Sequence, residues 1–205
     1  SRDWSSDVCS SDLTPNDPLV KRMTENALFA WSVYEGMATL GFTPRWIVGE
    51  QGDWIKDQLK DCPNMASWLN PNQGGASCRM VAVWRGNTNN SIMYNTMLIQ
   101  GGHEIFHLYQ QELWGQRWAD VPDWVREGGA NVGMSIISTH FDGKKTFPDY
   151  GAAAAAEKSS RDRGSCAAAL DKWESNQKSE GFGFNNGCEY RLGSIMNEFL
   201  RSEEH

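Results

Sequence analysis

The sequence predicts an α+β fold, in which a small mixed sheet packs on two long helices that carry the candidate site. Short β-rich runs at 44–50 and 79–86 come before the longest helical patterns. This order, with strands first and helices later, differs from the alternation of a βαβ chain. The residues from 91 to 113 are apolar nearly all round, which is typical of a buried helix.

The other elements follow from local patterns and from glycine and proline positions. The stretch 17–40 has apolar residues at three- and four-residue spacing and stops at Gly41. Pro, Asn and Gly residues predict a loop over 63–78, and Pro122 stands where a first helical turn tolerates proline. The expected order is a helix over 17–40, a strand over 44–50, a short helix over 53–62, a loop over 63–78, a strand over 79–86, a helix over 91–113, a loop over 115–121, a helix over 122–138, an insertion over 141–187 and a last helix over 188–200.

Both ends of the chain resemble translated sequencing-adapter sequence. The opening SRDWSSDVCSSDL matches one adapter orientation, and the closing RSEEH matches the other. We therefore expect residues 1–13 and 201–205 to lie outside the fold, as an appended scar would. The remaining 14–200 is expected to be a single domain, cut from a longer reading frame and long enough to bury a core.

Charge and hydropathy exclude two classes of partner. The formal net charge is −7, and it falls to about −4 when the two end segments are left out. No cluster of Lys and Arg is present, so the sequence gives no indication of nucleic-acid binding. No apolar run approaches the roughly 18 residues of a membrane-spanning helix. Oligomeric state is not indicated.

Four cysteines remain within 14–200, and none of them forms a C-x-x-C pair, which argues against a cysteine zinc site. Their order along the chain suggests the disulfides Cys62–Cys78 and Cys166–Cys188. Three pairings are open, and free buried thiols are the alternative. Disulfides would indicate an extracytoplasmic protein.

The motif with the clearest chemistry is GGHEIFH at 101–107, in a chain with 4 histidines. Positions four apart lie on one face of a helix, so His103 and His107 can both present a ring nitrogen to one metal ion. Glu104 is rotated off that axis and can act as a general base without being a ligand. This is the H-E-x-x-H arrangement, in which Zn²⁺ lowers the pKa of a water. Two hydrogen-bonded core histidines are the alternative.

A catalytic zinc site needs a third ligand from a second element, and the segment VPDWVREGGA offers Glu127. Glycines flank both parts of the candidate site, as Gly101 and Gly102 before the first histidine and Gly128 and Gly129 after the glutamate. Each glycine costs helix stability. Four of them therefore predict a close crossing of the two helices that carry the site.

Together these residues resemble the gluzincin zinc peptidases, in which a glutamate from the next helix joins the two histidines of H-E-x-x-H. The form W-x-x-E-G-x-A is similar to that of aminopeptidase N and its relatives, and the likeness covers roughly residues 95–135. The resemblance implies a zincin-like fold with His103, His107 and Glu127 as zinc ligands. It also implies that Asn131, at the place of an aspartate in a related branch, orients His103.

One further match to this family lies downstream, in YRLGSIMNEFL. In the family a tyrosine three residues before a glycine stabilises the oxyanion, and Tyr190 and Gly193 have this spacing, although Leu192 replaces the usual basic residue. A packing tyrosine is the alternative, and His140 is the rival stabiliser. The Gly-x-Met-Glu-Asn strand of the aminopeptidases has no counterpart upstream of the zinc helix, so aminopeptidase activity is not expected.

The function expected from the sequence is zinc-dependent hydrolysis of a peptide or protein substrate, with Glu104 as the general base. The alternative is a non-proteolytic zinc-binding adhesin or carbohydrate-binding module on the same fold, because a fold does not fix a function. Trp114, Trp118 and Trp124 surround the loop between the two site helices and could line a cleft. Cleavage preference is not indicated.

Overall fold

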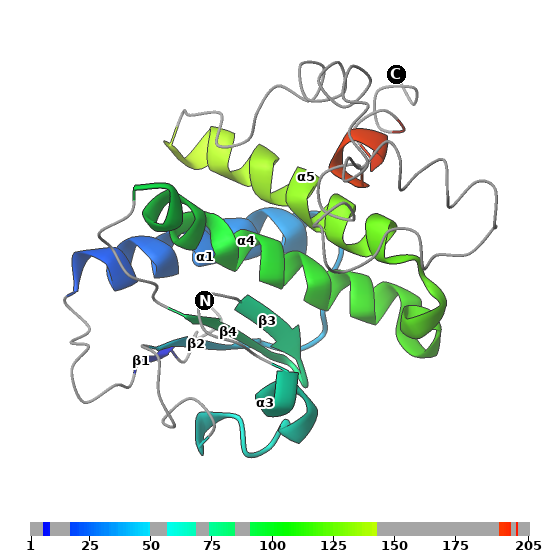
Figure 1. The fold of residues 1–205 in the computed structure, drawn as a ribbon, viewed down its shortest axis with the longest axis horizontal. Helices are drawn as coiled ribbons and strands as arrows, with labels where there is room; N and C mark the ends of the chain where they lie inside the picture. Colours follow the sequence, from blue (N-terminus) through cyan, green and yellow to red (C-terminus); the bar gives the residue numbers. More distant parts are fainter. Residues whose placement is uncertain are drawn as a thin grey trace, which may run out of the picture.

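The computed structural model describes residues 6–8, 17–49, 57–68, 74–84, 91–142, 193–197 and 200. In this part of the chain a four-stranded sheet lies between three long helices on one side and a short helix on the other (Figure 1). The α+β class predicted from the sequence is confirmed at this level.

The sheet has the strand order β1-β2-β4-β3, and it is mixed, as predicted. Strands β1 (Ser6–Val8), β2 (Arg45–Gly49) and β4 (Met80–Trp84) are parallel, and β3 (Gly74–Ser77) runs antiparallel to β4 at one edge. Strand β1 belongs to the segment 1–13, which was expected to lie outside the fold. The backbone of β1 pairs with that of β2 in parallel.

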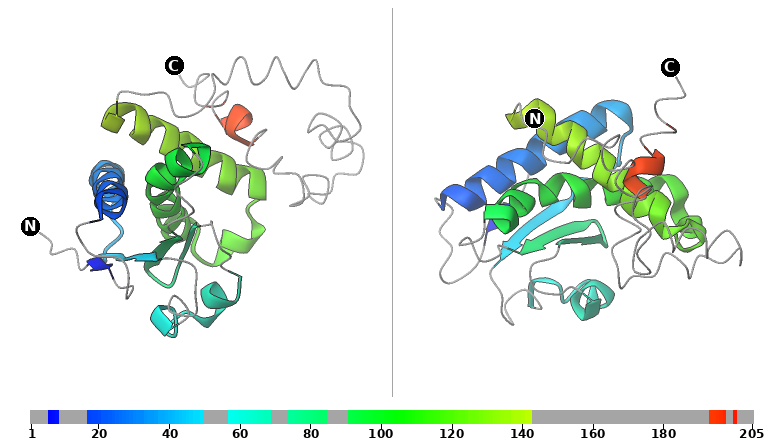
Figure 2. Two further views of the ribbon diagram at one scale, coloured as in Figure 1. Left: turned by 60° about the vertical axis from the view of Figure 1, so that its left-hand side comes forward. Right: turned by 45° about the horizontal axis from the view of Figure 1, so that its top comes forward.

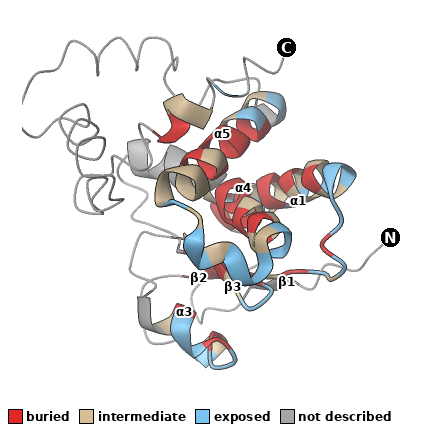
Figure 3. Cartoon of the chain, turned by 90° about the vertical axis from the view of Figure 1, so that its right-hand side faces the viewer, coloured by how far each residue is buried: buried red, intermediate tan, exposed pale blue. Residues whose placement is uncertain are grey.

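Side chains that alternate between the two faces of the strands divide the core into two clusters. The larger cluster fills the space between the sheet and the long helices, and the smaller one lies under the opposite face. Figure 3 shows the buried residues concentrated where the long helices face one another. The strand residues of the larger cluster are Trp46, Val48, Ala76, Val81 and Val83, and the smaller cluster consists of Ile47, Leu59, Cys62, Met65, Met80 and Ala82.

The three long helices are α1 (Pro18–Met37), α4 (Ser91–Trp114) and α5 (Asp123–Asp142). Helix α4 contacts both α1 and α5, and the three helices lie together above the sheet in both views of Figure 2. Helix α1 begins at a well-formed cap, where the Asp17 carboxylate accepts hydrogen bonds from two backbone N–H groups. All three helices were predicted near their observed starts. None of these helices, nor any other in the described part, is long and apolar enough to cross a membrane.

The loop predicted over 63–78 is wrong, because this stretch contains helix α3 (Pro63–Trp68) and strand β3. The strand was missed because its sequence, GGAS, has neither β-branched nor aromatic residues. Its pairing with β4 is made by backbone groups through a two-residue turn, in which Cys78 and Arg79 have φ values of 52° and 62°. Such turns are normally signalled by Asn-Gly or Asp-Gly, which this chain lacks here.

Two other boundaries also differ from the prediction. The loop expected over 115–121 is mostly a 3-10 helix, η1 (Gly115–Asp120). Helix α5 continues to Asp142, so that His140 lies inside the helix rather than past its end. His140 is exposed, and its Nδ1 lies 2.8 Å from the Ile136 carbonyl oxygen one turn before it.

The predicted close crossing of α4 and α5 is confirmed in part, because two of the four glycines face the opposite helix. A Cβ on Gly129 would lie 3.1 Å from Gln110 Nε2 of α4, and a Cβ on Gly102 would lie 3.7 Å from the Ile137 side chain of α5. The other two glycines face different neighbours: a Cβ on Gly101 would lie 2.8 Å from the Trp46 ring, on the sheet side, and a Cβ on Gly128 would collide with the backbone of Gly193.

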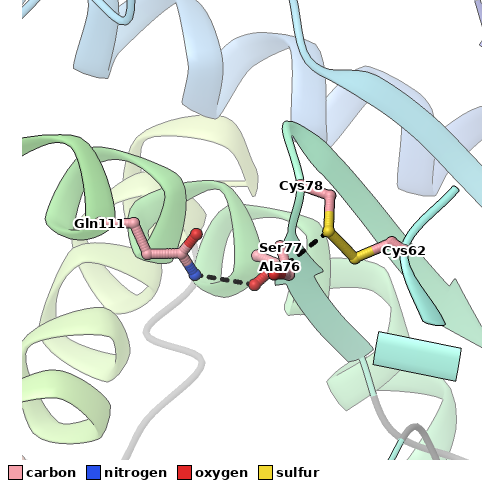
Figure 4. Close-up of a disulfide and its surroundings, with 5 residues drawn as sticks. All are labelled: Cys62, Ala76, Ser77, Cys78 and Gln111. Carbon is pink, nitrogen blue, oxygen red and sulfur yellow. Dashed lines mark hydrogen bonds between the residues drawn. A yellow bond between two sulfur atoms is a disulfide. The ribbon is translucent and has the colours of Figure 1, made fainter. Parts of the chain in front are cut away.

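The predicted disulfide Cys62–Cys78 is confirmed, whereas Cys166 and Cys188 lie outside the described residues. This disulfide ties the turn between β3 and β4 to the segment before α3 (Figure 4). On the other side of the same strand, Gln111 of α4 donates a hydrogen bond of 2.8 Å to the Ala76 carbonyl oxygen. Strand β3 is therefore held both by the disulfide and by the helix that carries H-E-x-x-H.

Candidate metal centre

Helices α4 and α5 bring three potential metal ligands together. His103 and His107, one turn apart on α4, have their Nε2 atoms 3.0 Å from each other. Glu127, near the start of α5, places Oε2 at 3.2 Å from the first nitrogen and 3.3 Å from the second. These three residues could hold a metal ion.

The spacing of these three atoms fits a tetrahedral ion. Ligand atoms at about 2.0–2.1 Å from a zinc ion, at tetrahedral angles, lie about 3.3–3.4 Å apart. The observed 3.0, 3.2 and 3.3 Å are close to this value. The triangle therefore needs only a small adjustment to close around an ion.

The outer nitrogen of each histidine also has a partner, which decides what the inner nitrogen can do. His103 Nδ1 lies 3.0 Å from Asn131 Oδ1, and His107 Nδ1 lies 2.8 Å from Gln110 Oε1. An amide oxygen only accepts, so each Nδ1 carries the proton and each neutral ring presents a lone pair at Nε2. Two lone pairs and a carboxylate oxygen then converge, and such an arrangement requires a cation or a shared proton between them.

Burial and charge shape the protonation of this triangle in the metal-free protein. The side chains of His103 and His107 are only 5% and 8% exposed, and that of Glu127 is 22% exposed. Burial alone would lower the pKa of His107, but the hydrogen bond and charge of Glu127, with the charge of Glu104, outweigh burial and raise it above 6.5. Burial opposes ionisation of Glu127, yet its interactions with the two histidines hold its pKa well below its usual range. The site is built to attract positive charge.

Glu104 follows the first histidine and is buried, with 4% of its surface exposed. Its Oε1 accepts a hydrogen bond of 2.7 Å from Gln100 Nε2, one turn earlier on α4. Strand β3 passes close to this pair, because a Cβ on Gly74 would lie 2.7 Å from Glu104 Cγ and 2.9 Å from Gln100 Cγ. The carboxylate is therefore fixed between its own helix and the edge of the sheet, apart from the three convergent ligand atoms.

Sequence reasoning missed Gln100 and Gln110, although a signal for each was available. Both lie about one turn from a site residue on the same helix, where side chains three or four apart meet. Gln110 is buried, with 6% of its surface exposed, and a buried amide needs partners. The spacing alone could not identify these partners, since they depend on α5.

Of the three tryptophans predicted around the loop between the two site helices, Trp118 lies beside a candidate ligand and Trp114 packs against Trp118. The Trp118 ring stands edge-on to the His107 ring, with centroids 5.9 Å apart, and the Trp114 ring lies 5.8 Å from Trp118 on the other side. The Arg126 guanidinium covers the Trp118 ring at 4.9 Å and pairs with Asp123, and burial lowers its pKa. Trp114 and Trp118 are half-buried, so this aromatic wall extends from a candidate ligand toward solvent.

The downstream residue Tyr190 lies outside the described residues, but Gly193 lies within them. The helical segment 193–197 packs on the start of α5: a Cβ on Gly193 would collide with the Trp124 carbonyl, and Asn197 Nδ2 donates to the same oxygen at 3.1 Å. This contact adjoins Glu127. The exposed side chain of His140 lies near the far end of α5.

No family model, curated protein or solved structure matches this chain. The gluzincin assignment therefore depends on the motif residues and on the geometry of the three candidate ligands.

Proposed function

We propose that this chain is a gluzincin-like zinc peptidase with a zincin-like fold. The observation that carries the proposal is the convergence of three acceptor atoms from His103, His107 and Glu127, 3.0–3.3 Å apart, with a separate buried carboxylate from Glu104 beside them. A structural histidine pair that shares a proton with Glu127 would account for the third acceptor, but it leaves the second buried carboxylate, Glu104, unexplained. The H-E-x-x-H peptidases use this division between ligands and base.

Zinc suits this donor set, since imidazole nitrogens and a carboxylate oxygen are among its usual ligands and three protein ligands leave one position open. When bound, it acts as a Lewis acid and lowers the pKa of a water toward neutrality. Asn131 and Gln110 hold the histidine tautomers that present Nε2 to the ion. The partly exposed Glu127 marks the side of the site nearest to solvent.

Glu104 is assigned as the general base. Gln100 donates to Oε1 and fixes the carboxylate, and no donor among the described residues reaches Oε2. We assign Oε2 to accept a proton from the attacking water as its oxygen bonds to the substrate carbonyl carbon. The same proton then passes to the leaving nitrogen as the C–N bond breaks. An acid and an amine result, and Glu104 returns to its carboxylate form.

The proposed substrate is an extended stretch of peptide or protein. The Cys62–Cys78 disulfide favours an extracytoplasmic setting for it, because disulfides persist in oxidising compartments. We assign the aromatic wall of Trp114 and Trp118 to contact a substrate side chain, because it begins at His107 and extends toward solvent.

The deciding experiment is a cleavage assay on an unfolded protein, such as reduced casein. The purified chain should contain about one zinc per chain, cleave casein, lose cleavage on treatment with a chelator and regain it on addition of zinc. Zinc binding without any cleavage would instead support the non-proteolytic adhesin or carbohydrate-binding alternative. Absence of zinc binding would overturn both.

A further inference from the structure

Gln110 makes two hydrogen bonds that join the second candidate ligand to the third. Its Oε1 lies 2.8 Å from His107 Nδ1, and its Nε2 donates to the Arg126 carbonyl oxygen at 3.1 Å. The Arg126 carbonyl belongs to the peptide group that connects Arg126 to Glu127. The buried Gln110 side chain therefore connects His107 on α4 to the backbone beside Glu127 on α5.

The bond to α5 determines which way the Gln110 amide points. An amide can present either its oxygen or its NH₂ group to a neighbour. A backbone carbonyl only accepts, so the NH₂ group must face Arg126 and the oxygen must face His107. If the amide were reversed, it would donate to Nδ1 and favour the tautomer that carries its proton on Nε2, which cannot bind a metal ion.

Gly129 leaves room for this arrangement on α5. A Cβ at this position would lie 3.1 Å from Gln110 Nε2, so any larger residue would press on the amide. Gly129 is thus a point of close approach between the two helices, at which the missing side chain makes room for Gln110.

We propose that Gln110 is a positioning residue for the metal centre: it holds His107 in the metal-binding tautomer, and its hydrogen bond to the Arg126 carbonyl fixes the direction in which its amide points. The inference rests on the proposed metal site but not on peptidase activity. Outer partners of ligating histidines typically contribute 10–100-fold to metal affinity. The affinity for zinc is therefore the property that Gln110 controls.

The test is the Kd for Zn²⁺ of the full chain, measured by competition with a chromophoric chelator. Gln110→Met keeps the length of the side chain and removes both hydrogen bonds, and we expect its Kd to rise by about 10–100-fold. Gln110→Glu loses the donor to Arg126 but keeps an acceptor for His107, and its Kd should stay within a few-fold of the parent value. This rescue is specific to positioning, because a residue that merely tied α4 to α5 would be impaired equally by either change.

Gln111→Met is the matched control. Gln111 is the adjacent glutamine of α4 and also donates to a backbone carbonyl on another element, that of Ala76, and among the described residues no hydrogen bond joins it to a candidate ligand. Its loss should lower the melting temperature without changing the Kd for zinc. Should Gln110→Met fail to fold, Gln110→Asn replaces it, since an amide one methylene shorter cannot reach His107.

The outcomes separate this inference from the proposed function. A parent chain that binds no zinc overturns the metal site itself. A parent that binds zinc, with Gln110→Met binding within two- to three-fold of it, overturns only the role of Gln110. Equal weakening by Gln110→Met and Gln110→Glu would also overturn that role, because it would show a tether between helices.

Discussion

Gly74 lies directly on Glu104: a Cβ at Gly74 would stand 2.7 Å from both Cγ and Oε1 of the carboxylate. The edge strand β3 therefore leaves no room for a side chain at Gly74 next to the proposed base. This contact explains why a strand of such weak β-propensity occupies the edge of the sheet. Larger side chains would strengthen the strand but displace the carboxylate.

Gly74→Ala should therefore reduce catalysis while leaving metal binding intact. The added methyl group must push either Glu104 or β3 aside, and a misplacement of about 1 Å can cost about 10²-fold in rate. We expect kcat for casein cleavage to fall to this extent with unchanged zinc content. Gly36→Ala is the control, since a Cβ there meets nothing within 4 Å. Equal activity of the Gly74→Ala variant and the parent would show that Glu104 does not depend on β3.

Glu104→Gln should separate the base from the ligands. The amide keeps the shape of the side chain but cannot take up a proton, so hydrolysis should fall by about 10²–10⁴-fold. Zinc content, measured by mass spectrometry of the metal, should stay near one per chain. Loss of zinc together with activity would mean that Glu104 is a ligand, and the assignment of the site would be wrong.

How far the sequence could predict this site depends on which interactions are local. The ligand pair His103 and His107 follows from spacing on one helix, and the long helices follow from their apolar periodicity. Gln110 could not be assigned from spacing, because its role depends on the Arg126 carbonyl of another helix. The glycines were recognised as sites of close approach, but the sequence does not say which neighbour approaches: Gly129 faces α4, whereas Gly128 faces Gly193.

The pH dependence of stability should have opposite signs with and without metal. In the metal-free protein the pKa of His107 is raised, so its stabilising proton is fully bound below about 6.5 and is lost as pH rises through the folded-state pKa. Glu127 has a lowered pKa, and its contribution is lost only as pH falls below about 4.5. Zinc requires the deprotonated ring, so it stabilises more as pH rises.

Melting curves from pH 6 to pH 8 provide the measurement. The chelator-treated chain should lose up to about 1.4 kcal/mol per pH unit, whereas the zinc-loaded chain should not. His107→Gln should remove the slope from the metal-free protein, and His140→Gln, which changes an exposed histidine, should leave it unchanged. A metal-free parent that becomes more stable between pH 6 and pH 8 would contradict the pairing of His107 with Glu127.

Deletion of residues 1–13 and 201–205 tests whether the ends belong to the fold. If they are adapter-derived, the melting temperature should remain essentially unchanged, because terminal segments seldom contribute unless they are tied down. Strand β1 makes the test sharper, since Ser6–Val8 pair with Trp46–Val48 at the edge of the sheet. A fall of several degrees would show that this strand is a genuine part of the protein.

The last prediction concerns Tyr190, three residues before Gly193. Gly193 packs against Gly128, next to Glu127. Tyr190 precedes Gly193 by the same spacing as the oxyanion-stabilising tyrosine precedes its glycine in the family. A phenol aimed at the developing negative charge would act in the transition state and hardly at all in the ground state. Tyr190→Phe should then lower kcat by about 10²–10³-fold, the usual loss for one oxyanion donor, with little change in KM.

The control for Tyr190→Phe is the retention of structure and zinc, since the substitution removes one hydroxyl and leaves the ring to pack. Zinc content and melting temperature should match those of the parent. If activity also stays within a few-fold of the parent, Tyr190 is a packing residue, and the downstream half of the family resemblance is lost. His140 is a poor substitute in that event, because its side chain is exposed and its Nδ1 lies beside the Ile136 carbonyl.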